Sequence, residues 1–252
     1  SLGELEPLSV RIGLIQDTLR PRFSEPQVVL FAGDNGLAVE GLPAPPGQTT
    51  AERVWQVLSG QLPLSVFAAT QGLAVSVVDA GVADRLVAHE RLLMRKIAHG
   101  TRNARVGPAM SVDQAQAAIR AGMEIGQSLP GNVLAFAGLG VGSHESAALI
   151  LSRLTGAPVR ELLLAHPQMD TNLLTHLLAV TQSAQARHRD VADPVEVLAA
   201  FGGFEIAMMA GAVIEAAAQR RVVVVDGFIS SNAALVAERL QPGVIGACVF
   251  AH

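Results

Sequence analysis

The chain has 252 residues, of which 50% are hydrophobic and 16% are charged, and its formal net charge is −4. A chain of this size and composition can bury a large core, so we expect a globular protein rather than a disordered one. The chain has 18 lysine and arginine residues and 22 aspartate and glutamate residues, and no long basic cluster occurs. This balance argues against a nucleic-acid-binding surface.

Three further features bear on the compartment and on metal binding. No apolar segment reaches the roughly 20 uninterrupted residues of a membrane-spanning helix, and no signal peptide opens the chain. The single cysteine, Cys248, lies in an apolar run, so we expect a buried thiol rather than a disulfide or a nucleophile. The seven histidines show no metal-binding spacing. We therefore predict a cytoplasmic protein with no membrane contact and no metal site.

Hydrophobic periodicity predicts helices and strands that alternate along most of the chain. From the N-terminus we expect a helix at 4–18, a strand at 27–32, helices at 49–60 and 62–71, a strand at 73–79 and an apolar segment at 86–98. A helix at 111–128, a strand at 132–137 and helices at 143–155 and 169–187 follow. The last predicted elements are helices at 193–201 and 203–219, a strand at 221–225, a helix at 230–240 and a strand at 245–250.

The predicted strands are apolar without alternation, as in Val222-Val223-Val224-Val225. This pattern is typical of parallel strands that helices cover on both faces. We therefore predict an α/β fold, with a Rossmann-like, doubly wound and mostly parallel sheet and helices on both of its faces. The crevice at the carboxyl ends of such strands is the expected ligand site. The alanine-rich helix at 206–218 packs either within this domain or at a dimer interface.

Three predicted strands end in small, polar turns that contain glycine and open a helix. The turns are Gly33-Asp34-Asn35-Gly36, Gly138-Leu139-Gly140-Val141-Gly142-Ser143 and Asp226-Gly227-Phe228-Ile229-Ser230. Glycine lets the backbone approach an anion, and helix N-termini offer free N–H groups, so these turns predict a site for a phosphorylated ligand. The G-x-G-x-G spacing differs from the dinucleotide fingerprint, and a purely structural turn remains the alternative there.

Two sets of polar residues beside these turns have alternative interpretations. His144, at the start of the helix after the second turn, either acts on a ligand as a titrating group or faces solvent. Asp34 and Asn35 either position a substrate at a strand end or form an ordinary turn.

Motifs in a fixed order along nearly the whole chain resemble the nicotinate-nucleotide:dimethylbenzimidazole phosphoribosyltransferase family of the cobalamin pathway. The most specific are Gly202-Gly203-Phe204-Glu205-Ile206-Ala207 and Asp226-Gly227-Phe228-Ile229-Ser230. The supporting motifs are Ser1-Leu2-Gly3-Glu4-Leu5-Glu6, Phe31-Ala32-Gly33-Asp34-Asn35-Gly36, Thr50-Ala51, Val77-Val78-Asp79-Ala80-Gly81-Val82, Gly100-Thr101-Arg102-Asn103, the turn at 138–142 and Asp193-Pro194.

The resemblance implies transfer of 5-phosphoribose from nicotinate mononucleotide to 5,6-dimethylbenzimidazole, which gives α-ribazole 5′-phosphate and nicotinate. It implies no metal or redox cofactor, and it implies a homodimer whose other partners are these small molecules. It also implies two domains, a smaller helical one to which residues 1–24 contribute and a Rossmann-like one over residues 25–252.

The resemblance also assigns site residues. The phosphoribosyl group is implied to lie among residues of the glycine-containing turns, namely Gly140, Gly142, Ser143, Gly202, Gly203, Asp226, Gly227 and Ser230. The loop that carries Asp34, Asn35 and Gln48 is implied to face the aromatic base. The general base of the family is a glutamate, which we expect beyond His252.

Several positions depart from the family pattern. The family's glutamate before the glycine turn falls on Gly138, and its phosphate-binding lysine falls on or beside Leu177. The family's Gly-Thr-Gly turn falls on His166-Pro167-Gln168, and its histidine after Asp34 falls on Asn35. Its loop glutamine falls on Gly47, and the next residue of this chain is Gln48. A desolvated phosphate site without its lysine loses a charge-assisted contact of about 1.5–3 kcal/mol.

Three hypotheses about function follow from these departures. The chain is an active but divergent phosphoribosyltransferase, or a catalytically impaired member of the family that binds a nucleotide or regulates a partner. The third hypothesis is a transferase with another nucleotide donor or another acceptor.

Overall fold

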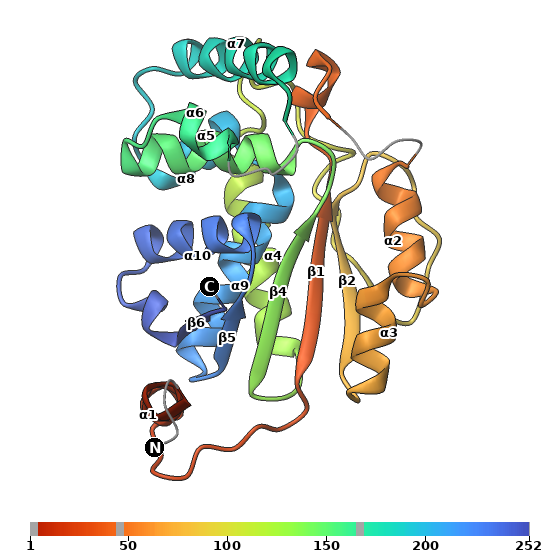
Figure 1. Cartoon of the computed structure of the whole chain (residues 1–252), viewed down its shortest axis with the longest axis vertical. Helices are drawn as coiled ribbons and strands as arrows, with labels where there is room; N and C mark the ends of the chain where they lie inside the picture. The colour runs from red at the N-terminus through yellow and green to blue at the C-terminus, as the bar shows by residue number, and fades with distance from the viewer. Residues whose placement is uncertain (1–4, 44–47, 165–168, 252) are drawn as a thin grey trace.

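The structure is a computed structural model that describes residues 5–43, 48–164 and 169–251. At its centre lies a six-stranded sheet in the order β3-β2-β1-β4-β5-β6, in which every pair of neighbouring strands is parallel. Helices lie on both faces of this sheet (Figure 1). The predicted α/β, doubly wound fold is therefore confirmed.

The bounds of the elements are close to the predicted ones. The strands are β1 (Gln27–Gly33), β2 (Ala74–Gly81), β3 (Leu92–Met94), β4 (Val133–Leu139), β5 (Val222–Val225) and β6 (Cys248–Phe250). The α-helices are α1 (Leu5–Gln16), α2 (Thr50–Leu58), α3 (Pro63–Thr70), α4 (Val112–Ser128), α5 (Ser143–Thr155), α6 (Val159–Leu163), α7 (Thr171–Arg187), α8 (Pro194–Phe201), α9 (Phe204–Ala218) and α10 (Phe228–Leu240). The 3-10 helices are η1 (Gly36–Glu40) and η2 (Val244–Ala247).

Four short elements differ from the prediction. The apolar segment at 86–98 contributes only the short strand β3, which pairs with β2 alone at the edge of the sheet. The strand predicted from residue 245 begins at Cys248, because the residues before it form η2. The sequence analysis did not predict α6 or η1, since five residues are too few to show a helical period.

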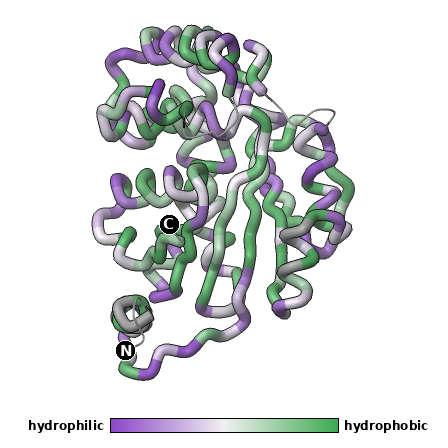
Figure 2. Tube along the Cα trace, in the orientation of Figure 1, coloured by the Kyte–Doolittle hydropathy of each residue, from purple (hydrophilic) through white to green (hydrophobic). Residues whose placement is uncertain are grey.

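The strands are apolar throughout because each face of the sheet meets a different hydrophobic layer. Val29 and Phe31 of β1 belong to the large core that also contains the buried residues of α4, α9 and α10. Leu30 and Ala32 of the same strand belong to a second core beneath α2. Alternate side chains thus enter two apolar layers, and the central strands are hydrophobic along most of their length (Figure 2).

Helix α1 packs at the lower end of the sheet in Figure 1, apart from the other helices. Its Ile12 and Ile15 form a small apolar cluster with Val222 of β5 and Ala247 of η2. The assignment of residues 1–24 to a second, smaller domain stays a prediction, and its first four residues lie outside the described ranges.

The alanine-rich helix α9 packs inside the domain, between the sheet and α4. All of its residues from Phe204 to Val213 are buried, and it contacts α4, α10 and the strands β1, β2, β4 and β5. Small side chains let two helices approach closely, and α4 presents Ala118, Ala121 and Gly122 as buried residues. Packing within the chain therefore accounts for the alanine-rich composition of α9.

We expect the substitution Ser111→Ala to lower the free energy of unfolding by about 1 kcal/mol, because it removes the N-terminal cap of α4. The Ser111 Oγ accepts the Gln114 N–H at 3.0 Å, and the Gln114 Oε1 accepts the Ser111 N–H at 3.0 Å. Urea unfolding measures the loss. The control is Ser128→Ala, which removes a hydroxyl that donates to the Ile125 carbonyl at 3.0 Å in the last turn of the same helix, and an equal loss there would contradict the capping argument.

Candidate active site

The strand order puts the expected ligand-binding point of this sheet between the carboxyl ends of β1 and β4. These two strands are neighbours, but the helices that follow them leave toward opposite faces, with α2 on the smaller core and α5 on the larger one. A crevice opens where two adjacent parallel strands send their helices to opposite sides. The turns predicted to bind a phosphorylated ligand at Asp34–Asn35 and at Gly140–Ser143 lie at this point.

Asp34 builds the rim of the crevice by joining three segments. Its Oδ1 accepts the hydroxyl of Thr50 at 2.6 Å, and its Oδ2 accepts the Ala83 N–H at 2.7 Å. The Thr50 hydroxyl in turn accepts the Val141 N–H at 3.2 Å. The end of β1, the start of α2, the loop after β2 and the turn after β4 are thereby held together. The sequence analysis quoted Thr50 only as part of a motif and missed this role.

Asn35 and Ser143 lie beneath the surface of the crevice and connect its two turns. Asn35 and Ser143 are 3% and 0% exposed, so their polar atoms are directed at the protein. The Asn35 backbone N–H donates to the Val141 carbonyl at 3.1 Å, and its side-chain oxygen accepts the Ser146 hydroxyl at 3.1 Å. These two residues set the spacing of the turns from below, whereas Asp34 and Gly140 are partly exposed above them.

A buried glutamate, Glu205, completes this layer and was missed as a site residue. Its Oε1 accepts the Ser143 hydroxyl at 2.8 Å and the Asn35 amide at 3.0 Å. Burial raises the pKa of the Glu205 carboxyl to about 7, while the bonds from Asn35 and Ser143 lower it and the charge of Asp34 raises it. The only sequence signal was the place of Glu205 in the first turn of a helix within a quoted motif.

The turn after β5 lies beside the turn after β4. The ring of Phe228 packs on the ring of His144 with 4.6 Å between their centroids, and the side chain of Ile229 fills the space next to Gly138. The Ser230 hydroxyl donates to the Asp226 carbonyl at 2.6 Å and is buried, while Asp226 and Gly227 are exposed. Of this turn, Asp226 and Gly227 therefore present the accessible surface.

Gly202 and Gly203 form the buried junction between α8 and α9. Gly203 is the residue before the first turn of α9, and the Glu205 carboxyl lies against its Cα. This junction brings the N-terminus of α9 under the end of β1, where the Glu205 Oε2 lies against Gly33. The N-termini of α2, α5, α9 and α10 thus all lie at the carboxyl edge of the sheet, where helix dipoles favour an anion.

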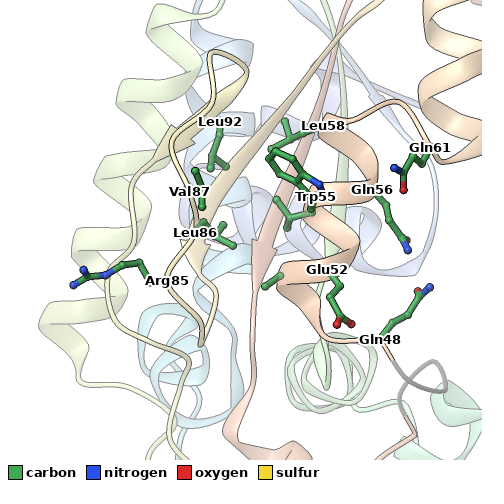
Figure 3. A pocket seen from close by; sticks show the side chains of 12 residues that line it. Gln48, Glu52, Trp55, Gln56, Leu58, Gln61, Arg85, Leu86, Val87 and Leu92 are labelled. Carbon is green, nitrogen blue, oxygen red and sulfur yellow. The ribbon is translucent and has the colours of Figure 1, made fainter.

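Gln48 lies at one end of a separate apolar cavity of about 530 Å³ between α2 and the loop that follows β2. Figure 3 shows Trp55 on α2 facing Leu86, Val87 and Leu92 across this cavity, with Gln48 and Glu52 at the same end of the helix. The structure does not bring Gln48 into contact with the buried layer of Asn35, Ser143 and Glu205. It does place Gln48 next to the first turn of α2, whose Thr50 bonds Asp34.

The comparisons with known proteins agree with this geometry. A phosphoribosyltransferase family model matches residues 1–252. The chain belongs to this phosphoribosyltransferase family. It is therefore an enzyme of the pentosyltransferase class by descent.

Named relatives are 38% to 44% identical to the chain over the aligned region. A protein of Cupriavidus taiwanensis named nicotinate-nucleotide–dimethylbenzimidazole phosphoribosyltransferase is 44% identical over 255 residues, and the alignment covers 100% of the chain and 74% of the relative. A protein of the same name from Roseiflexus is 40% identical, with 72% of the relative covered. The crystal structure of CobT from Thermus thermophilus superimposes with a TM-score of 0.92 at 31% identity, over 100% of the chain and 76% of that protein.

The phosphoribosyltransferase differs from the family pattern at positions that the structure now explains in part. Leu177 is fully buried in the large core, so a phosphate contact from this position of α7 is absent. At Gly138, the space that a side chain needs is occupied by Ile229. The segment His166-Pro167-Gln168 and the residue Gly47 lie outside the described ranges.

Three further observations concern the described residues alone. Cys248 is fully buried, and burial raises the pKa of its thiol to about 11, which confirms that it is a core residue. Within residues 5–43, 48–164 and 169–251, no cluster of three or more histidine, cysteine, aspartate or glutamate side chains is arranged to hold a metal ion. None of the helices described in these ranges has the length and hydrophobicity to cross a membrane.

Proposed function

We propose that the protein transfers 5-phosphoribose from nicotinate mononucleotide to 5,6-dimethylbenzimidazole, which gives α-ribazole 5′-phosphate and nicotinate for the lower ligand of cobalamin. The observation that carries this proposal is the 44% identity, over the whole chain, to a relative named for this reaction. The crevice at the ends of β1 and β4 supplies the anion-binding turns that a phosphorylated donor needs.

The proposed reaction exchanges one C–N bond for another at C1′ of the ribose. The bond from C1′ to the nicotinate nitrogen breaks, the benzimidazole nitrogen forms the new bond, and the benzimidazole N–H proton is released. C1′ gains positive charge as nicotinate leaves, so a carboxylate near it lowers the barrier. The general base that the family resemblance assigns to a glutamate beyond residue 252 stays a prediction.

In this proposal the phosphate lies over the backbone of the turns at Gly140–Ser143 and Asp226–Ser230, next to Gly202 and Gly203. The acceptor base lies along the loop from Asp34 to Gln48. Support for the second placement comes from the apolar cavity that Gln48 and Trp55 line, since planar aromatic ligands bind in apolar pockets with few polar groups. We also propose that the protein is cytoplasmic, forms a homodimer and needs no cofactor. Light scattering of the purified protein tests the homodimer.

One observation favours a second candidate function. The buried Leu177 removes the phosphate contact that the resemblance assigns to a lysine there, and a catalytically impaired protein that still binds the nucleotide tolerates such a loss. We favour the active enzyme, because the motifs at residues 202–207 and 226–230 are present and the relatives align over the whole chain.

Calorimetric titration with nicotinate mononucleotide, followed by addition of dimethylbenzimidazole and chromatography of the products, separates these functions. We expect saturable binding of the donor and formation of α-ribazole 5′-phosphate. Binding with no product would support the impaired family member, and no binding would exclude nicotinate mononucleotide as the donor.

A further inference from the structure

The Glu205 carboxyl is fully buried and contacts both the turn after β1 and the turn after β4. Its Oε1 accepts two hydrogen bonds, one from the turn after β1 through Asn35 and one from the turn after β4 through Ser143. Its solvent exposure is 0%. A single oxygen atom therefore connects the two strand ends between which the ligand crevice lies.

The second oxygen of the same carboxyl, Oε2, is also buried but has no hydrogen-bond partner among the described residues. An ionised carboxylate in this position would keep charge on an oxygen that accepts no hydrogen bond from any other described residue, which is unfavourable in a protein interior. A neutral acid avoids this cost, because the proton on Oε2 removes the charge. The asymmetry of the two oxygens thus favours a carboxylic acid with its proton on Oε2.

Glycines on two sides make room for the carboxyl. A methyl group on Gly33, at the end of β1, would lie 2.5 Å from Oε2, and a methyl group on Gly203 would overlap both oxygens. The carboxyl therefore lies flat between the last residue of β1 and the residue that caps α9. Its position is fixed by backbone on both sides, so it cannot turn away from the two strand ends.

We propose that Glu205 is a positioning residue, a neutral carboxylic acid that fixes the distance between the turn after β1 and the turn after β4 while adding no negative charge beneath the phosphoribosyl site. The proposal rests on the function proposed above. In the proposed function the phosphate lies over the turn at Gly140–Ser143, and an ionised carboxylate below this turn would repel it. A neutral Glu205 holds Asn35 and Ser143 in place and leaves the crevice free for the anion.

The charges around Glu205 agree with this state. Burial is the main cause that raises the pKa of Glu205 to about 7, and the charge of Asp34 also raises it. The hydrogen bonds from Asn35 and Ser143 lower the pKa. A bound phosphate acts in the same direction as Asp34, so we infer that the donor increases the protonated fraction near neutral pH. The ionisable groups on the elements packed around it are Asp34 after β1, Asp79 on β2 with its partner Lys96, and His144 and Glu145 on α5.

The first test measures stability and is independent of catalysis. The folded-state pKa of about 7 lies above the usual 4.5, so the native state binds the proton more tightly than the unfolded chain. Glu205 therefore stabilises the fold fully below pH 4.5, and this contribution is lost as pH rises toward 7. We expect the difference in melting temperature between the wild type and Glu205→Gln to fall over this window and to become constant above it.

The second test measures proton uptake when nicotinate mononucleotide binds. Calorimetry in two buffers of different ionisation enthalpy at pH 7.5 should show a larger proton uptake for the wild type than for Glu205→Gln, which shares every other group. We expect Glu205→Gln to bind the donor within about threefold of the wild type. Glu205→Leu, which lacks the acceptor oxygen, should bind the donor at least tenfold more weakly, which is about the contribution of one hydrogen bond between neutral groups.

Opposite results would overturn the proposal in distinct ways. A Glu205→Gln protein whose stability runs parallel to the wild type from pH 4.5 to 8 would show that Glu205 is ionised. Equal proton uptake by both proteins, or donor affinity of Glu205→Leu equal to the wild type, would exclude the positioning role. If the donor binds to no variant, the proposed function is wrong, and the stability curves still decide whether Glu205 is the buried acid.

Discussion

Replacing Lys96 by methionine should destabilise the protein by about 3–5 kcal/mol, the usual cost of removing one partner of a buried ion pair. Lys96 is the only lysine in the sequence, and its ammonium nitrogen lies 3.4 Å from Oδ2 of Asp79, whose side chain is fully buried. The substitution would leave the Asp79 carboxylate without a counter-charge. Urea unfolding at pH 7.5 measures the loss.

Lys96 also holds the loop after β2, so the loss of stability from the broken ion pair has to be separated from the loss of these loop contacts. Its ammonium donates to the carbonyls of Val82 and Asp84 at 2.6 Å each. The double variant Asp79→Asn, Lys96→Met lacks the buried charge but also lacks these two bonds. We expect it to be more stable than Lys96→Met alone, because the neutral amide still accepts the Val82 N–H as Asp79 does. Equal stability of the two variants would assign the whole loss to the loop.

Most of the fold could be predicted from the sequence, because the dominant signals are local. Continuous apolar runs such as residues 27–32 and 222–225 indicated strands buried on both faces, and the observed sheet confirms that reading. Helices with capping residues, such as α4 after Ser111 and α8 after Asp193, began within one residue of the predicted start. Short elements such as α6 and η1 were missed because too few residues carry a period.

The layer beneath the site was harder to predict, because it depends on contacts between distant segments. Thr50 joins Asp34 to Val141. Glu205 bonds Asn35, which lies 170 positions before it in the sequence, and Ser143, which lies 62 positions before it. A threonine that begins a helix and a glutamate in a first helical turn are ordinary cap residues by sequence alone. Turn residues could be identified as candidates, but which of them are buried, as Asn35 and Ser143 are, required the structure.

The largest loss of activity is expected from Gly140→Ala. Gly140 is the point at which the turn after β4 approaches the end of β1, and a methyl group there would overlap the carbonyl oxygen of Gly33 and lie 2.9 Å from the Ser143 hydroxyl. Backbone atoms cannot yield as a flexible side chain does, so the turn has to move away from β1. A displacement of about 1 Å in a positioning segment costs roughly a hundredfold in rate. We therefore expect kcat/KM for nicotinate mononucleotide to fall by about that factor.

Two matched glycine variants make this prediction specific to the crevice. Gly107→Ala places its methyl group in open space, with no heavy atom within 4 Å, and should keep the wild-type rate. Gly138→Ala meets Cγ2 and Cβ of the Ile229 side chain rather than backbone, so its effect should be intermediate. Circular dichroism at the assay temperature establishes that each variant is folded. A folded Gly140→Ala protein with wild-type kcat/KM would show that the turn after β4 does not position the donor, because the backbone displacement that the methyl group forces would then leave the reacting groups untouched.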